Sequence, residues 1–244
     1  MISGLKKDFK KHLINIPGHR TSRKIIVLES DDWGSIRMPS KEAINRFREA
    51  GIAVDSCGYM LNDALETNED LEFLFETLTS QKKFKPVITA NFLTANPSFE
   101  KIESSRFREY SWEPLESTLS QRPQYNKVKE LWLKGYDKGF FIPQLHGREH
   151  LNISRWMSDL KLGNKETLLG FKLGTLGRNG NPEKESRGSY QAAFDKGKPG
   201  FTVDYDKVLQ DAVGEFKRIF GFTPKTFIAP NYVWGAEVEK ETAK

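Results

Sequence analysis

The chain contains no stretch of about eighteen apolar residues, the minimum for a helix that crosses a bilayer. Its single cysteine, Cys57, excludes an intrachain disulfide and is compatible with a reducing compartment. The first residues are basic but have neither an apolar segment nor a small-residue cleavage site, so we expect no signal peptide. These absences lead us to expect a cytoplasmic protein without a transmembrane segment.

Neither sign of charge is scarce. The chain has 38 lysines and arginines and 33 aspartates and glutamates, which gives a net charge of +5. The basic residues accompany no recognisable nucleic-acid-binding motif, so we expect no nucleic-acid partner. Two interpretations of the excess stay open: a solvated surface, or attraction to an anionic glycan, sugar nucleotide or lipid surface. The length of 244 residues suits one domain of α/β-barrel size or a compact pair of smaller ones.

Predicted strands alternate with predicted helices along the chain, which is typical of a parallel sheet or barrel. Apolar, β-branched runs predict strands at residues 25–29 (a buried one), 86–92, 140–145 and 225–229. Helical spacing and capping residues predict helices at residues 3–13, 41–50, 67–80, 125–136 and 204–220. We therefore expect an α/β fold in a single domain over residues 1–244.

Two stretches interrupt this alternation, at residues 96–123 and 174–200. Both are expected to be insertions or long loops within the domain, where they could shape a substrate groove. The aromatic residues of the first stretch have two open interpretations. They could stack on sugar rings, or they could pack the insertion onto the rest of the domain.

Histidine is scarce as well, yet two of the four histidines, His146 and His150, lie four residues apart. That spacing is about one helical turn, so both imidazoles can reach one ion. Imidazole binds zinc and its first-row neighbours, and a third ligand is available in the acidic turn of Asp31 and Asp32. The pair alone is equally compatible with two solvated histidines and an acidic surface turn.

Three ordered motifs resemble those of the NodB-homology polysaccharide deacetylases, the family-4 carbohydrate esterases. They are Ser-Asp-Asp-Trp-Gly at residues 30–34, His-Gly-Arg-Glu-His at 146–150, and Thr-Phe-Ile-Ala-Pro-Asn-Tyr at 226–232. The segments before the second and third motifs, residues 135–146 and 216–224, also resemble the family's pattern. The resemblance spans roughly residues 24–235. It implies a distorted (β/α) barrel that hydrolyses N-acetyl groups on a polysaccharide or glycan precursor, with zinc or another first-row divalent metal as cofactor.

The resemblance also implies a role for each motif residue. Asp32, His146 and His150 would be the metal ligands, Asp31 the general base, and the backbone N–H of Tyr232 an oxyanion donor. The different roles of the two adjacent carboxylates require a turn, which we expect at Trp33 and Gly34. Substrate contacts are expected from four residues in these motifs: Trp33, Arg148, Pro230 and Asn231.

This chain departs from the family's pattern at several positions. Ile228 and Ala229 stand where the third motif has an arginine, Gly147 replaces a serine or threonine, and Trp33 separates the aspartates from Gly34. Arg148 could be a substitute cation or a solvated side chain, and both interpretations stay open.

No histidine follows the third motif to act as the general acid. We therefore expect a barrel incomplete at the C-terminus, either a truncated fragment or a degenerate relative, with little or no deacetylase activity. A carbohydrate-binding protein without turnover and a related barrel that cleaves another linear amide are alternative functions. The sequence specifies no sugar, linkage or oligomeric state.

Overall fold

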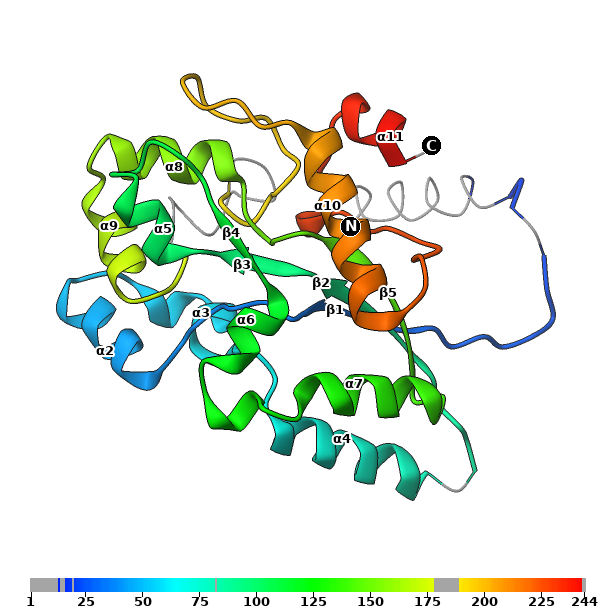
Figure 1. Ribbon diagram of the computed structural model, residues 1–244. Coiled ribbons are helices and arrows are strands. Elements are labelled where there is room, and N and C mark those ends of the chain that lie inside the picture. The colour runs from blue at the N-terminus through cyan, green and yellow to red at the C-terminus, as the bar shows by residue number, and fades with distance from the viewer. Residues whose placement is uncertain (1–12, 14–15, 19, 82, 178–188, 243–244) are drawn as a thin grey trace, which may run out of the picture.

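The computed structural model describes residues 13, 16–18, 20–81, 83–177 and 189–242. They form a mixed α/β fold around a three-stranded parallel sheet of order β1-β2-β5 (Figure 1). Its strands are β1 (Leu28–Trp33), β2 (Ile88–Leu93) and β5 (Phe141–Gly147). A parallel bridge between Leu145 and Phe227 adds the predicted 225–229 segment beside β5. The parallel α/β arrangement is confirmed, and the sheet formed by the described residues is open, not a closed barrel.

Helices connect the strands. They are α2 (Lys41–Glu49), α3 (Gly58–Asn62), α4 (Asn68–Ser80), α5 (Phe99–Ser104), α6 (Leu115–Ser120), α7 (Val128–Asp137), α8 (Ile153–Lys161), α9 (Lys165–Lys172), α10 (Tyr205–Phe220) and α11 (Ala236–Thr242). The predicted N-cap is in place, because the Ser40 side chain accepts a hydrogen bond from the Ala43 amide. Thr67 and Asp70 form a capping box at the start of α4, which was not predicted. The helices predicted at 41–50, 67–80, 125–136 and 204–220 are confirmed, whereas the one at 3–13 lies outside the described residues apart from its last residue.

The main apolar core lies between the sheet and three helices. Helices α4 and α7 lie side by side along the sheet, and α10 packs against β5 (Figure 1). Phe92 and Phe141 from the strands pack with Phe75 of α4, Trp132 of α7 and Phe216 of α10. Each of these five side chains is buried, so the core fixes the strands whose carboxyl ends carry the polar motifs. None of the helices described combines the length and apolar composition that a bilayer crossing requires.

The stretch at residues 96–123 has short elements of its own, including an antiparallel pair of β3 (Ala95–Pro97) and β4 (Trp112–Pro114). Its aromatic rings face a second core: Phe99 contacts Trp156, and Phe107 contacts Phe171. Packing, and not sugar stacking, is therefore the role that these contacts support. Part of the 174–200 stretch, residues 178–188, lies outside the described residues.

The prediction of a buried strand at residues 25–29 is wrong. Strand β1 begins only at Leu28, and Ile25, Ile26 and Val27 are 60%, 86% and 71% exposed. The physical reason is position, because β1 is the edge strand of the sheet that the described residues form, and within it pairs on one side only, with β2. A run of β-branched residues indicates strand propensity, whereas burial depends on what packs against the strand.

Candidate metal centre

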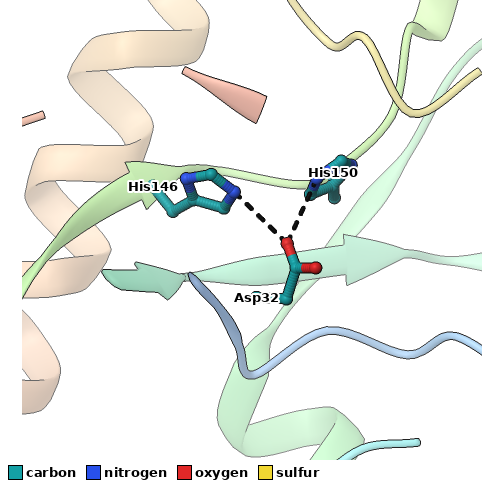
Figure 2. Close-up of side chains that lie close together, drawn as sticks. All are labelled: Asp32, His146 and His150. Atoms are coloured by element: carbon teal, nitrogen blue, oxygen red, sulfur yellow. Dashed lines mark ion pairs between the residues drawn. The ribbon is translucent and has the colours of Figure 1, made fainter. Parts of the chain in front are cut away.

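Three predicted ligands meet at the carboxyl ends of the parallel strands. Asp32 comes from β1, His146 from β5, and His150 from the segment that follows β5 (Figure 2). Asp32 Oδ1 lies 3.2 Å from His146 Nε2 and 3.1 Å from His150 Nε2. Parallel strands bring residues from distant parts of the chain to one end of a sheet, and here they bring both sequence motifs to one point.

The backbone of β1 changes direction at Asp32 itself. Its φ of 69° lies in the left-handed region, and the pairing register with β2 shifts between Ser30 and Trp33. The turn that we expected at Trp33 and Gly34 therefore begins one residue earlier. Such a conformation costs a non-glycine residue about 1–3 kcal/mol, and it lets adjacent carboxylates point to different partners. Asp31 accepts hydrogen bonds from Asn91 Nδ2 at 2.7 Å and from the Tyr232 hydroxyl at 2.8 Å.

The hydrogen bond of His146 and the lowered pKa of His150 suit metal ligands. His146 Nδ1 lies 2.8 Å from the Ile228 carbonyl oxygen, which accepts only if Nδ1 carries the hydrogen, so a neutral ring presents a bare Nε2. Burial and the Arg37 guanidinium lower the pKa of His150 to about 4, which keeps this ring neutral. Although burial of Asp32 opposes ionisation, His146, His150 and Arg37 together hold its pKa well below the ordinary range.

This donor set fits a cation. The three ligand atoms lie within 4.8 Å of one another, and Asp32 Oδ1 is buried without a hydrogen-bond partner. Ligand atoms that are each about 2.1 Å from a tetrahedral zinc ion lie about 3.4 Å apart, close to the two distances from Asp32. An anionic oxygen facing two imidazole nitrogens is unfavourable unless a proton or a cation lies between them. The buried Asp-His-His group could therefore hold a metal ion.

Arg37 was not among the residues predicted for the site. Its Nη2 donates to Asp32 Oδ2 at 2.7 Å, and its Nη1 donates to the side-chain oxygen of Gln191. The one signal in the sequence was its position, five residues after Asp32 in the loop that leaves β1. Arg148 has neither of the two roles considered for it. Its side chain is buried and pairs with Glu149 and Asp211. It does not line the cavity beside the ligand group.

A cavity of about 900 Å³ opens over the ligand group. Asp31, Trp33, Asn231 and Tyr232 line it together with the three ligands, whereas Pro230 is buried and does not. Glu66, also in the lining, accepts a hydrogen bond from the Gly34 amide at 3.2 Å, and burial raises the pKa of its carboxyl group to about 7.

No protein-family model, curated protein or solved structure matches this chain.

Two predicted contributors to the cavity have other contacts in this structure. The Tyr232 N–H donates to the Ala229 carbonyl oxygen at 2.9 Å, so the geometry does not support its predicted role as an oxyanion donor. The Tyr232 hydroxyl, on a side chain that is 65% exposed, reaches Asp31 instead. The Trp33 ring packs against Phe92 and Phe141 of the main core.

Proposed function

We propose that this protein is a metal-dependent amide hydrolase of the polysaccharide deacetylase type, which removes N-acetyl groups from a carbohydrate. The observation that carries this proposal is the convergence of Asp32, His146 and His150, with Asp32 Oδ1 buried and without a hydrogen-bond partner, beside a cavity of about 900 Å³. In this proposal the parallel strands and their helices belong to a distorted (β/α) barrel, and the active site lies at the carboxyl ends of the strands.

The proposed cofactor is zinc or another first-row divalent ion, held by one carboxylate and two imidazoles. Three protein ligands are typical of catalytic zinc sites, because further coordination positions stay open for substrate and water. Such an ion would act as a Lewis acid on an amide carbonyl and would acidify water. His146 and His150 contribute neutral rings, and the Ile228 carbonyl holds the His146 ring in the orientation that directs Nε2 at the ion.

Asp31 is the proposed general base. Its carboxylate lines the cavity next to Asp32 but is not part of the ligand group. Asn91, which also donates to Glu29 at 3.1 Å, holds one of its oxygens, and the exposed Tyr232 hydroxyl holds the other. Because Tyr232 is on the surface, its hydroxyl can give way to a water molecule, from which Asp31 would then take a proton.

A specific observation favours the second candidate, a carbohydrate-binding protein without turnover. The Tyr232 amide, which the resemblance assigns to the oxyanion, is already paired with Ala229. A hydrolase of this type gains much of its rate from donors directed at the developing oxyanion. If this pairing persists when substrate binds, the protein would keep its ligands and cavity and lose most of its rate.

The test compares Asp31→Asn with Asp32→Asn in zinc-loaded protein. Acetate released from chitin oligomers reports turnover, and equilibrium dialysis reports the bound metal. We expect the turnover of the wild type to be low, that of Asp31→Asn to be about 10²–10⁴-fold lower still with the metal retained, and both turnover and metal to be lost in Asp32→Asn. Asp55→Asn, which removes only an exposed ion pair with Arg48, is the control.

Each result has a separate meaning. Loss of metal in Asp31→Asn with retention in Asp32→Asn would reverse the two roles. Oligomer binding without acetate release in the wild type would support the second candidate.

A further inference from the structure

We propose that Arg37 is a positioning residue that makes Asp32 a ligand through one oxygen only. This inference rests on the proposed metal site. A carboxylate can bind a metal through one oxygen or both, and the two oxygens of Asp32 differ in their surroundings. Oδ1 faces His146 and His150, whereas Oδ2 accepts a hydrogen bond of 2.7 Å from Arg37 Nη2. The guanidinium thereby occupies one oxygen and leaves the other for the ion.

Arg37 is itself held in place. Its side chain is 12% exposed, and its Nη1 donates to the side-chain oxygen of Gln191, 154 positions later in the chain. The backbone N–H of Gln191 donates to the Ser189 hydroxyl at 3.0 Å. Because the guanidinium is planar and rigid, fixing one nitrogen on Gln191 fixes the direction of the other toward Asp32. The guanidinium therefore links two distant segments at the ligand group.

Asp32 needs such a restraint. Its backbone has a φ of 69°, and its side chain is the most exposed of the three ligands, at 27% against 2% for His146 and 3% for His150. Among the described residues the Arg37 bond is the one hydrogen bond found for Oδ2. Without it the carboxylate could rotate, or turn both oxygens toward the ion.

The positive charge of Arg37 lowers the affinity for a metal ion, whereas its positioning of Asp32 raises that affinity. A guanidinium beside the ligand group repels a divalent cation and helps to keep His150 unprotonated. If Arg37 were only a counter-charge for Asp32, its removal would tighten metal binding. If it positions Asp32, its removal weakens metal binding, because partners of metal ligands typically contribute about 10–100-fold in affinity. The two roles therefore predict opposite signs.

The experiment measures zinc and cobalt(II) dissociation constants, and the visible spectrum of the cobalt form, for the wild type and Arg37→Gln. We expect about 10–100-fold weaker binding of both ions in the variant, with a changed cobalt spectrum because the coordination of Asp32 changes. Arg37→Lys keeps the charge and can reach Asp32 but lacks the fork that also reaches Gln191, so it should recover part of the affinity.

Two further variants complete the design. Gln191→Met removes the acceptor for Arg37 without touching a ligand, and we expect a smaller loss in the same direction. It also provides the test if Arg37→Gln fails to fold, which thermal unfolding without metal reveals. Arg46→Gln removes the same charge from an exposed ion pair with Glu49 and should leave affinity unchanged.

The outcomes separate this inference from the proposed function. Unchanged or tighter binding in Arg37→Gln and Gln191→Met, together with a metal-binding wild type, would overturn the positioning role and leave the metal site intact. A wild type that binds neither zinc nor cobalt would contradict the proposed function and this inference together.

Discussion

At the amino-terminal ends of its strands the parallel sheet leaves several apolar side chains exposed, whereas directly after the carboxyl-terminal end of β5 two charged side chains are buried. Ile26 is 86% exposed just before β1, and Ile142, early in β5, is 48% exposed. Arg148 and Glu149, which follow β5, are only 4% and 3% exposed. Hydropathy alone predicts the reverse of this distribution.

The difference shows that ion pairs between buried side chains concentrate at the carboxyl end of the sheet. Burying a charge is unfavourable unless partners compensate it, and the carboxyl end provides them: Arg148 pairs with Glu149 and Asp211 and lies over the Trp112 ring at 5.1 Å. Arg148 and Glu149 of this ion cluster lie between the two histidines of the ligand group, and Asp211 reaches them from α10. The amino-terminal end has no comparable set of polar contacts among the described residues. We therefore expect substitutions at the two ends to have very different effects.

The largest expected effect on stability is at the buried ion cluster. Arg148→Met leaves Glu149 buried without its partner, so we expect a loss of about 3–5 kcal/mol in the free energy of unfolding. Arg46→Met, in an exposed pair with Glu49, should cost no more than about 1 kcal/mol. Urea unfolding of both variants is the measurement. Similar small losses in the two would mean that the buried cluster is not what distinguishes the carboxyl end.

Acid should affect the carboxyl end next. The pKa of His150 is lowered from 6.5 to about 4 in the folded protein, so between these values the unfolded chain binds a proton that the folded one does not. The free energy of unfolding therefore carries no penalty from His150 above pH 6.5. In metal-free protein it falls by about 3 kcal/mol as the pH falls from 6.5 to 4. Urea unfolding across this range should show a slope of unfolding free energy against pH that is more positive in the wild type than in His150→Gln.

Other groups do not interfere with that comparison. The pKa of Glu66 is raised to about 7, which gives the opposite slope in both proteins, and the low pKa of Asp32 matters only below its ordinary value of 3.8. Identical pH profiles for the wild type and His150→Gln would show that His150 is protonated normally in the folded protein.

A smaller effect is expected at Gly34, directly after the ligand turn. Its φ is +83°, and an added Cβ would lie 2.7 Å from the Leu93 carbonyl oxygen. Gly51 has a similar φ of +74° but open space around it, so Gly51→Ala isolates the cost of the backbone conformation. Gly34→Ala should lower the free energy of unfolding by about 1–3 kcal/mol more than Gly51→Ala. Equal losses would show that the segment after β1 relaxes freely.

The smallest effect is expected at the exposed end of the sheet. Ile26→Ser should change the free energy of unfolding by less than about 0.5 kcal/mol and leave metal affinity unaltered, because little of this side chain is buried. A loss of about 2 kcal/mol or more in chemical unfolding would mean that Ile26 is covered in solution, and the contrast between the two ends would then disappear.

Much of the ligand group could be predicted from the sequence, because its signal is local. The four-residue spacing of His146 and His150, and an aspartate shortly after a predicted strand, are local signals. The helical turn expected for the histidine pair is wrong, because His146 lies in β5 and His150 lies in the non-helical segment after it. The parallel arrangement then brings these ligands together. The capping residue Ser40 likewise marks the start of α2.

The remainder depends on contacts between distant segments. The pairing of Arg37 with Asp32 depends on the positive φ of Asp32 and on Gln191, 154 positions after Arg37, and neither has a local signature. Arg148 was misjudged because nothing in its motif indicates that Asp211 lies beside it. The exposure of Ile26 follows from the edge position of β1, which depends on the order of the whole sheet.

The central claim is that Asp32, His146 and His150 bind one metal ion, and metal content tests it most directly. A chelator first removes any bound metal from the purified protein, which is then dialysed against zinc. Inductively coupled plasma mass spectrometry measures the zinc that stays bound. We expect about one zinc ion per chain in the wild type and in Ile26→Ser, and almost none in His146→Ala or His150→Ala. Absence of bound zinc in the wild type, or undiminished zinc in both histidine variants, would contradict the account.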